Sequence, residues 1–434
     1  MENTKTIAKA RQGLHGTIEI PGDKSISHRS VMFSALGSTP VHITNFLHAQ
    51  DCLSTAACMK ALGASVEFES ETALAVCGHG LHGLQEASTI IDAGNSGTTL
   101  RLMMGILAPQ PFLTTFTGDA SLYKRPMGRV IKPLSAMGAK IYGRENNTKL
   151  PITIVPAESR LHGMVYESPV ASAQVKSAIL LAGMYADGPT TVVEPFTSRD
   201  HTERMLEAFG IETKKEGTAV TIEPVDSFRA PEAIEVPGDI SSAAYWLVAG
   251  SVVPGSSLLL KNVGVNPTRT GILDVLKAMG ASVTLENERV SGGEAAADIR
   301  VEAVKLHGTS FGAEIMPRLI DEIPVIAVAA LFAEGDTVIT GAGELRVKET
   351  DRLQAITNEF NKLAPGSVEA SEDGLVIHGG TKVQCANCFS YDDHRMAMSL
   401  AILGTAGEGV EIERPDCVNI SYPAFYGTLA RLQA

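Results

Sequence analysis

The chain has 434 residues and a formal net charge of −13 at pH 7, which argues against nucleic acid or an anionic membrane surface as its main partner. This length exceeds the usual size of a single hydrophobic core, so we expect two domains. Apolar residues make up 44% of the chain but aromatic residues only 5%, which indicates aliphatic cores of the α/β or α+β class.

The first residues, "MENTKTIAKARQG", carry charges and no apolar run, so they resemble neither a signal peptide nor a membrane anchor. Longer apolar stretches such as "IPVIAVAALFA" are too short to form a transmembrane helix. We therefore expect a soluble, cytoplasmic protein.

One structural phrase occurs twice. The sequence "IEIPGDKSISHRS" begins at Ile18 and returns as "IEVPGDISSAAYW" at Ile234. The first copy carries Lys24, His28 and Arg29, whereas the second has no cation at the matching positions. We interpret the copies as the starts of two duplicated lobes, with an anion site retained in the first only.

A second repeat consists of helix-like runs that end in a glycine, at residues 63, 138, 210 and 280. At each position we expect a helix, a glycine of positive φ and then a strand. The spacings of 75, 72 and 70 residues suit a whole supersecondary unit. Six such units fit the chain, three in each domain.

The two Pro-Gly-Asp phrases, at residues 20–23 and 236–239, indicate twin crossovers between the domains. One domain is then discontinuous and comprises residues 1–20 plus 238–434. The other is the insertion, residues 21–237. A cleft between two similar lobes is a favoured place for a ligand.

Several cations lie where a helix should begin, where they oppose the helix dipole at a cost of about 0.3 to 1 kcal/mol each. They are Lys24, Arg29, Arg199 and, with His394 before it, Arg395. In one of these helices we expect Ser198 as the N-cap and Gly210 as the stop. The recurrence predicts that anions bind at these helix starts.

Other predicted helix starts offer anion ligands without a cation in the first turn. Around Gly97, the residues Asn95, Ser96 and Thr98 are candidate caps, and the glycine lets an anion approach the backbone. An ordinary capped helix is the alternative. Ser172 and Gln174 lie near another start, with Lys176 farther in, and Arg125 precedes a proline that can begin a helix.

Two charged segments complete the candidates. In "ELRVKETDRL", Lys348 and Arg352 share a helical face while Glu349 points elsewhere, unless this is only a solvated charged face. In "PRLIDEIP", Asp321 or Glu322 caps a helix, and a carboxylate among cations could orient or deprotonate a hydroxyl.

Cofactor and metal motifs are weak. Cys385 and Cys388 form a lone CxxC, which we interpret as a reduced loop or strand edge, with a metal or redox role as the less favoured alternative. "GHGLHG" fits G-x-G-x-x-G, but no helix-like run follows it. We expect no cofactor and no metal.

The ordered motifs resemble one family. They are "PGDKSISHR", "DAGNSGTTLRL", "GDASLYKRPM", "ASAQVKSAILLAG", "TSRDHTERM", "PRLIDEIP", "ELRVKETDRL" and "DDHRMAM". Together they are similar to 5-enolpyruvylshikimate-3-phosphate synthases of the bacterial class that carries "SAQVK" and "ELRVKETDR". The resemblance implies two similar lobes, each of three βαβαββ units, with an active-site cleft between them.

The resemblance also implies an activity: transfer of the enolpyruvyl group of phosphoenolpyruvate to the 5-hydroxyl of shikimate-3-phosphate, through a tetrahedral intermediate and with release of phosphate. The residues implied for shikimate-3-phosphate are Lys24, Ser25, Arg29, Ser172, Gln174, Ser198, Arg199, Asp321 and Lys348. Those implied for phosphoenolpyruvate are Lys24, Gly97, Arg125, Gln174, Arg352 and Arg395. Those implied for proton transfer are Lys24, Asp321 and Glu349.

The chain departs from the family pattern at two site positions. Glu344 stands where many members have Asn near the shikimate hydroxyls, and Ile420 stands where many have a Lys for phosphoenolpyruvate. We expect Lys176 or water to replace that cation. We also expect Lys24→Ala to cripple turnover and Ser241→Ala to leave it intact, and Gly97 to leave room for the inhibitor glyphosate.

Two other functions stay open. A UDP-N-acetylglucosamine enolpyruvyl transferase would share the fold and the donor, but it uses a loop cysteine that "GDASLYKRPM" lacks. A catalytically dead relative that binds phosphometabolites is the other, and the presence of Lys24, Asp321 and Glu349 argues against it. We expect a monomer whose partners are the two small substrates.

Overall fold

The computed structural model describes residues 3–434, and the chain divides into two units. Unit 1 contains the N-terminal segment up to Pro21 together with Gly238–Arg289 and Ala295–Ala434. Unit 2 contains Gly22–Pro237 and the short segment Val290–Glu294. The chain therefore passes between the units at the two Pro-Gly-Asp phrases. The hairpin tip at residues 290–294 also belongs to unit 2, which the sequence did not predict.

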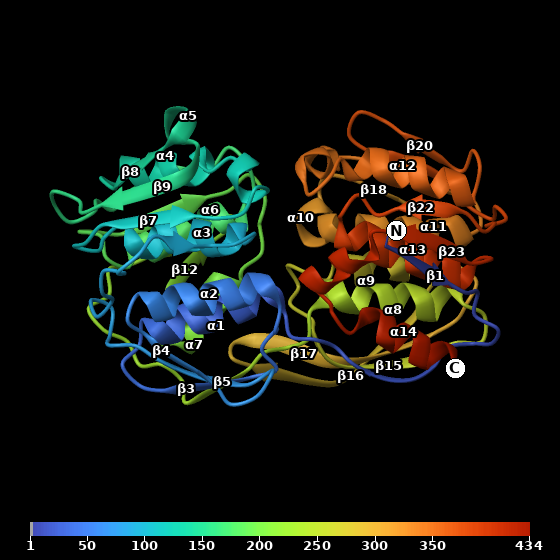
Figure 1. The fold of residues 1–434 in the computed structure, drawn as a ribbon, viewed down its shortest axis with the longest axis horizontal. Helices are drawn as coiled ribbons and strands as arrows, with labels where there is room; N and C mark the ends of the chain where they lie inside the picture. Colours follow the sequence, from blue (N-terminus) through green and yellow to red (C-terminus); the bar gives the residue numbers. More distant parts are fainter. Residues whose placement is uncertain (1–2) are drawn as a thin grey trace. The chain divides into compact units, whose positions relative to one another are not determined.

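The strands of residues 3–434 form six small sheets, three in each unit (Figure 1). Every sheet contains a parallel pair followed by an antiparallel neighbour. Six mixed sheets of one design agree with the repeated units predicted from the glycine spacing.

The strand orders in unit 2 are β14 (Ala233–Glu235)-β3 (Val41–Thr44)-β5 (Leu74–Cys77)-β4 (Ser65–Phe68), β6 (Ile91–Asp92)-β7 (Thr114–Thr117)-β9 (Lys149–Val155)-β8 (Lys140–Gly143), and β10 (Val165–Glu167)-β11 (Thr190–Val193)-β13 (Ala219–Ile222)-β12 (Thr213–Glu216). Those in unit 1 are β16 (Ser282–Ser291)-β17 (Glu294–Glu302)-β15 (Ser257–Gly264)-β2 (His15–Glu19), β18 (Ser310–Phe311)-β19 (Asp336–Ile339)-β21 (Leu375–His378)-β20 (Val368–Ala370), and β1 (Thr4–Ile7)-β23 (Val410–Glu413)-β22 (Asn387–Phe389).

Helices cover the sheets within each unit, as α1 and α2 do beside β3–β5 in Figure 1. The helices of unit 2 are α1 (Lys24–Ala35), α2 (Gln50–Ala61), α3 (Gly97–Leu107), η1 (Leu122–Lys124), α4 (Gly128–Ala136), α5 (Arg144–Asn147), α6 (Ala173–Gly183) and α7 (His201–Ala208). Those of unit 1 are α8 (Ile240–Val252), α9 (Gly271–Ala278), α10 (Met316–Leu319), η2 (Ile320–Glu322), α11 (Ile323–Phe332), η3 (Gly343–Val347), α12 (Arg352–Leu363), α13 (His394–Ala406), η4 (Pro415–Ile420) and α14 (Phe425–Gln433). None of the helices within residues 3–434 combines the length and hydropathy that a membrane span requires.

The glycine stops follow the prediction. Gly63, Gly138, Gly210 and Gly280 have φ values of 94°, 100°, 77° and 86°. Each lies just beyond the end of a helix and just before a strand. Glycine adopts this left-handed conformation without the steric cost of a Cβ atom, so these residues end the helices sharply.

The duplicated phrase performs the same local task in both copies. Asp23 caps α1 by accepting a hydrogen bond from the backbone N–H of Ile26 at 2.9 Å, and Asp239 caps α8 by accepting from that of Ser241 at 2.8 Å. The glycine before each Asp lies in a tight space: a Cβ atom on Gly22 would lie 1.9 Å from the carbonyl oxygen of Asn45. The two helix starts are thus built by the same cap.

The helices α3 and α6 pack almost backbone against backbone. A Cβ atom on Gly105 of α3 would lie 2.2 Å from the carbonyl oxygen of Ala178 in α6. Both residues are buried in a continuous aliphatic core. This close contact fixes the start of α3 beside the start of α6, where several candidate site residues lie.

The core of unit 1 is built around α8, α11 and α13. The apolar segment "IPVIAVAALF" forms α11 and is almost entirely buried. Trp246 of α8 is fully buried, and its indole N–H donates a hydrogen bond to the Tyr422 hydroxyl at 3.0 Å.

We predict that Gly22→Ala destabilises unit 2 by about 3 kcal/mol or more, because the new methyl group meets the Asn45 backbone and the crossover must shift. Gly188→Ala is the matched control, since a Cβ atom there meets nothing within 4 Å. Thermal unfolding measures both. Equal midpoints for the two variants would contradict the tight crossover.

Candidate functional site

The start of α1 places Lys24 beside an acid that the sequence did not reveal. The Lys24 Nζ atom lies 3.2 Å from Asp51 Oδ2, and the two side chains are 29% and 10% exposed. Burial raises the pKa of Asp51, but attraction to Lys24 and His28 outweighs it, and the pKa is lowered overall. In the sequence, Asp51 is an ordinary acid in the first turn of α2, so no local signal marks it as a partner of Lys24.

Arg29 lies one turn farther along α1 and is almost fully buried. Its Nε, Nη1 and Nη2 atoms donate to Thr202 Oγ1 at 2.7 Å, the Ser25 carbonyl at 2.9 Å and Ser177 Oγ at 2.9 Å. Burial lowers the pKa of Arg29 to about 10, although Glu203 and Asp23 attract its charge. Ser25 is therefore linked to Arg29 through its backbone, while its side chain is partly exposed.

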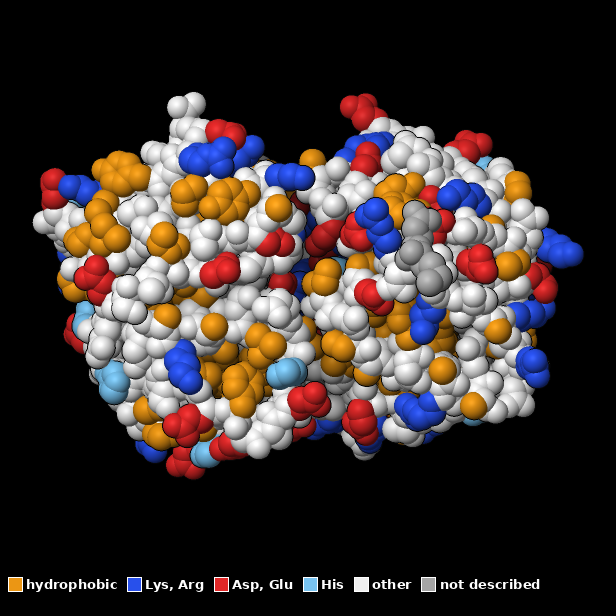
Figure 2. All heavy atoms as spheres, in the orientation of Figure 1, with side chains coloured by type: hydrophobic (Ala, Val, Ile, Leu, Met, Phe, Trp, Pro, Cys, Tyr) orange, Lys and Arg blue, Asp and Glu red, His pale blue; other side chains and the backbone are white. Residues whose placement is uncertain are grey.

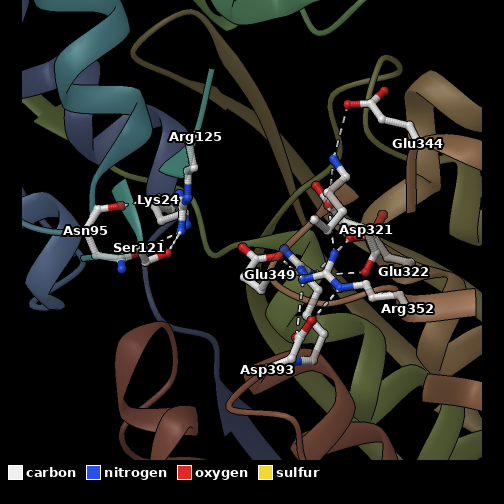
Figure 3. Close-up of polar contacts among 12 residues, drawn as sticks. Lys24, Asn95, Ser121, Arg125, Asp321, Glu322, Glu344, Glu349, Arg352 and Asp393 are labelled. Carbon is white, nitrogen blue, oxygen red and sulfur yellow. Dashed lines mark hydrogen bonds and ion pairs between the residues drawn. The ribbon is translucent and has the colours of Figure 1, made fainter. Parts of the chain in front are cut away.

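Arg125 follows η1 and is held by the loop before α3. Figure 3 shows its guanidinium directed toward Asn95 and Ser121. The Nη2 atom donates to Asn95 Oδ1 at 2.8 Å and to Ser121 Oγ at 3.2 Å. The helix after Arg125 begins at Gly128, two residues beyond Pro126, so the prediction that the proline begins this helix was wrong.

The start of α3 is capped by Ser96, whose Oγ accepts a hydrogen bond from the Thr99 N–H at 3.1 Å. Gly97 follows as the first helical residue. A Cβ atom on Gly97 would lie 2.8 Å from Arg101 Nη1 and 3.5 Å from Arg125 Nη1. Gly97 therefore allows the Arg101 guanidinium to approach the start of α3 more closely than a side chain at this position would permit.

Gln174 joins the starts of α3 and α6. Its side-chain amide donates to Thr98 Oγ1 at 3.0 Å, and its carbonyl oxygen accepts from Arg101 Nη1 at 2.7 Å. Burial and, to a smaller extent, the nearby cations Arg129 and Arg125 lower the pKa of Arg101 to about 9. Arg101 could not be recognised in the sequence as a site residue, because it sits in an apolar helical run with no charge pattern.

Two predictions about helix starts in unit 2 need correction. The helix after "FTSRD" begins at His201 with Asp200 in the N-cap position, so Ser198 is not the cap and Arg199 precedes the first turn. Ser198 instead donates its hydroxyl to Glu194 Oε2 at 2.8 Å. A serine that bonds to a carboxylate four residues before it looks the same in the sequence as a capping serine.

Lys176 does not replace the missing phosphoenolpyruvate cation. Its side chain is 2% exposed and its Nζ atom lies 3.1 Å from Glu194 Oε2 and 2.7 Å from Glu203 Oε1. Burial lowers the pKa of Lys176, but the two glutamates outweigh burial and raise it. Lys176 is therefore a charged residue of the interior, committed to two acids of its own unit.

In unit 1, Arg352 forms the centre of a second cluster (Figure 3). Its Nε atom lies 2.7 Å from Asp393 Oδ2, and its Nη2 atom lies 2.6 Å from Glu349 Oε2. Burial opposes the charge of Arg352, but Asp393 and Glu349 outweigh burial and raise its pKa. Asp393 also caps α13 by accepting from the Arg395 backbone N–H at 2.8 Å, so one buried acid pairs with Arg352 and caps the helix that carries Arg395.

The predicted helical face of Lys348 and Arg352 was wrong. The helix α12 begins at Arg352 with Asp351 as its N-cap, and Lys348 has an extended backbone after η3. Glu349 does not point elsewhere, because it forms an ion pair with Arg352. The capping aspartate breaks the helical spacing that the charge pattern suggested.

Asp321 lies in η2 among three cations. Its Oδ1 atom lies 3.8 Å from Lys348 Nζ and 3.5 Å from Arg352 Nη1, and its carbonyl accepts from Arg395 Nη1 at 3.1 Å. Burial opposes the charge of Arg395, but Asp321 and its neighbours outweigh burial and raise the pKa. Glu344, which departs from the family pattern, lies 3.5 Å from Lys348 Nζ.

The second copy of the duplicated phrase contacts this cluster. Ser241 Oγ donates to Glu322 and accepts from Arg269 Nη2, and Glu322 Oε1 lies 3.7 Å from Arg395 Nη1. Glu322 occupies the N-cap position of α11 without a capping hydrogen bond from its side chain. Ser241 is therefore tied to the surroundings of Arg395, and a different control is needed for tests of Lys24.

The remaining predicted features lie outside these clusters. Ile420 is the last residue of η4 and is partly exposed. Cys388 lies in the strand β22 and Cys385 precedes it, with both thiols free. No group of three or more His, Cys, Asp or Glu residues within 3–434 is arranged to hold a metal ion. Figure 2 shows acidic and basic side chains interspersed over the visible faces, without an extended basic patch.

The predicted site residues thus fall into two groups, one in each unit. Those of unit 2 are Lys24, Ser25, Arg29, Gly97, Arg125, Ser172, Gln174, Ser198 and Arg199. Those of unit 1 are Asp321, Lys348, Glu349, Arg352 and Arg395. The cations of unit 2 combine with hydroxyl and amide donors, whereas those of unit 1 lie beside carboxylates. Guanidinium and ammonium groups suit phosphate and carboxylate ligands.

Comparisons with known proteins agree with this chemistry. A family model described as EPSP synthase (3-phosphoshikimate 1-carboxyvinyltransferase) matches residues 8–429. The chain is 52% identical over 429 residues to the 3-phosphoshikimate 1-carboxyvinyltransferase of Bacillus cereus (strain 03BB102), with 99% of each chain covered. It is 50% identical over 417 residues to that of Desulforamulus reducens, with 96% of each covered.

Solved structures give the same result. The structure of EPSP synthase from Acinetobacter baumannii has a TM-score of 0.90 and 41% identity, covering 99% of this chain and 98% of that one. The enolpyruvyl transferase NikO from Streptomyces tendae has a TM-score of 0.79 at 17% identity, covering 100% and 98%, and shares the fold.

We predict that His28 makes unit 2 sensitive to acid. His28 is fully buried, its Nδ1 lies 2.6 Å from Thr55 Oγ1, and burial lowers its pKa from 6.5 to about 3. Below its ordinary pKa the unfolded chain binds a proton that the folded chain excludes, so stability is complete above 6.5 and declines as the pH falls toward 3.

At about pH 5 the loss is about 2 kcal/mol relative to neutral pH. Urea unfolding of the wild type and of His28→Gln at both pH values checks this, since the variant lacks the titrating group. An identical pH dependence in the two proteins would contradict the prediction.

Proposed function

Because the chain belongs to the EPSP synthase (3-phosphoshikimate 1-carboxyvinyltransferase) family, we propose that its two groups of site residues bind the two substrates of that enzyme. The activity is enolpyruvyl transfer in the shikimate pathway, which supplies the aromatic amino acids. The observation that carries this conclusion is the family match over residues 8–429.

Shikimate-3-phosphate carries a carboxylate, a phosphate and hydroxyl groups. Arg29 and Ser25 bind its carboxylate. Hydroxyl, amide and guanidinium donors bind its phosphate, and they are Ser172, Gln174, Ser198 and Arg199. Asp321 and Lys348 contact its hydroxyl groups. The distance of 3.8 Å between Asp321 Oδ1 and Lys348 Nζ supports this assignment, because one acceptor and one donor then lie side by side.

Phosphoenolpyruvate is a compact anion that requires several cations. Its ligands are Lys24, Gly97, Arg125, Gln174, Arg352 and Arg395. The guanidinium groups of Arg101 and Arg125 lie beside Gly97, and this proximity supports the assignment. Ile420 supplies no charge, and Lys176 is committed to Glu194 and Glu203, so the site works with one cation fewer than many relatives have.

The reaction forms one bond and breaks another. The 5-hydroxyl oxygen attacks C2 of phosphoenolpyruvate and loses its proton, while C3 gains a proton, which gives a tetrahedral intermediate. Loss of phosphate from C2 and of a proton from C3 then restores the double bond. Lys24, Asp321 and Glu349 carry these protons, because an acid and a base must flank the same centre.

Electrostatics supports Asp321 as the base. Lys348 and Arg352 lie within 4 Å of its carboxylate and stabilise its negative charge. An ionised carboxylate can accept the hydroxyl proton. The cations around it stabilise charge that develops on the substrate oxygens in the transition state.

The finer organisation follows the family. The two units are the two lobes, each of three βαβαββ units, and residues of each lobe bind the substrates. The protein acts as a cytoplasmic monomer without cofactor or metal. Its partners are shikimate-3-phosphate and phosphoenolpyruvate.

We predict that Lys24→Ala lowers kcat/KM by at least about a hundredfold, because the substrate loses a cation and a proton carrier together. The measurement is phosphate release from phosphoenolpyruvate in the presence of shikimate-3-phosphate. Lys60→Ala, an exposed lysine in the last turn of α2, is the matched control and should retain wild-type activity. A Lys24→Ala enzyme as active as the control would refute the role of Lys24.

We also predict inhibition by glyphosate in competition with phosphoenolpyruvate. In Gly97→Ala, the new methyl group displaces the Arg101 guanidinium, and the glyphosate concentration for half inhibition rises by about tenfold, as expected when a charge-assisted hydrogen bond weakens. Steady-state inhibition curves for the two proteins test this. Wild-type turnover that ignores millimolar glyphosate would show that the surroundings of Gly97 are not an inhibitor site.

A further inference from the structure

Glu194 connects the two segments that carry Ser172 and Ser198. Its Oε1 atom accepts a hydrogen bond from the backbone N–H of Ser172 at 2.8 Å. Its Oε2 atom accepts from the backbone N–H of Ser198 at 3.2 Å and from the Ser198 hydroxyl at 2.8 Å. One carboxylate thus holds the start of α6 and the loop before α7 in a fixed relation.

The surroundings of Glu194 hold its side chain in place. Its side chain is 2% exposed, and Lys176 Nζ lies 3.1 Å from Oε2. Lys176 also contacts Glu203 at 2.7 Å, and Glu203 attracts the charge of Arg29. A buried ion pair is weak support for the stability of a fold, because desolvation offsets most of the attraction. The buried group of Lys176, Glu194 and Glu203 is better explained by a role in positioning Ser172 and Ser198.

The geometry also allows Ser198 to change partner without movement of its backbone. A hydroxyl has one proton to donate, and that of Ser198 is donated to Glu194. A phosphate dianion offers only acceptors, so the hydroxyl must turn from Glu194 to contact it. The Ser198 N–H bond to the same carboxylate then still holds the loop in place.

We propose that Glu194 is the positioning residue for the phosphate of shikimate-3-phosphate, holding Ser172 and Ser198 at the spacing that this group requires. The inference rests on the proposed function, which assigns both serines to the phosphate. The inference adds that the Glu194 carboxylate sets the preference for shikimate-3-phosphate over shikimate. Glu194 itself touches neither substrate.

Glu194→Gln tests the proposal with little change in side-chain shape. In one orientation of the new amide, its NH₂ group faces the backbone N–H of Ser172. In the other orientation it faces the backbone N–H of Ser198 and the ammonium group of Lys176. At least one segment therefore loses its anchor. We expect the affinity for shikimate-3-phosphate to fall by roughly tenfold to a hundredfold, the range for hydrogen bonds to a charged group.

The decisive readout is the inhibition constant of shikimate divided by the dissociation constant of shikimate-3-phosphate. Shikimate shares the ring and the carboxylate but lacks the phosphate, so this ratio measures the advantage of the phosphorylated ligand. In Glu194→Gln the advantage of the phosphorylated ligand should fall by about tenfold or more, while the inhibition constant of shikimate stays near the wild-type value.

Glu203→Gln is the matched control. It removes the other carboxylate from Lys176 but leaves both serines bonded to Glu194. It also weakens the attraction on Arg29, which affects shikimate and shikimate-3-phosphate alike because both carry the carboxylate. The ratio should therefore stay at the wild-type value even where the variant is less stable.

Three outcomes separate the possibilities. A lower ratio in Glu194→Gln but not in Glu203→Gln supports the proposal, and an equal change in both variants overturns it. If Glu194→Gln does not fold, Glu194→Asp is used, because it keeps the charge for Lys176 but is one methylene too short to reach both backbone amides. An unchanged ratio in Glu194→Asp then overturns the proposal, whereas a wild-type protein that releases no phosphate overturns the proposed function itself.

Discussion

Pairing of the site cations Lys24, Arg352 and Arg395 with carboxylates of their own unit is the interaction on which the rest of the structure depends. Lys24 is paired with Asp51, and Arg352 with Asp393 and Glu349. A cation at a helix start opposes the dipole, and a buried one also pays for its desolvation. The acids offset both costs, so the cations stay charged in partly enclosed positions. They can then meet a multiply charged substrate without first being ionised or brought together.

The same principle explains how the duplicated phrase diverged. Asp23 and Asp239 cap α1 and α8 in the same way, so the backbone of the phrase was retained in both copies. In the second copy the positions of Lys24 and Arg29 are taken by Ile240 and Tyr245, both buried in the core of unit 1. The cations of unit 1 come from other segments, the starts of α12 and α13. Duplication therefore preserved the helix start and left each unit to place its charges separately.

The sequence predicted features that depend on neighbours along the chain, and it missed those that depend on distant partners. The glycine stops follow from local backbone geometry, and the structure has them where they were expected. Asp51 and Glu194 could not be recognised, because each looks like an ordinary polar residue until the fold brings its partner close. Asn95 was expected only as a helix cap and not as the partner of Arg125. The same limit produced the wrong assignment for Lys176, which is paired with acids of other elements. The wrong assignment for Lys348 has a local cause, because the cap at Asp351 separates it from α12.

A crystal structure with shikimate-3-phosphate and glyphosate bound would test the central claim most directly. The account predicts ligand carboxylate and phosphate oxygens within about 3.2 Å of nitrogen atoms in the side chains of Lys24, Arg125, Arg352 and Arg395. The carboxylates that hold Lys24, Arg352 and Arg395 should remain beside them. Ligands bound away from these four side chains would contradict the account.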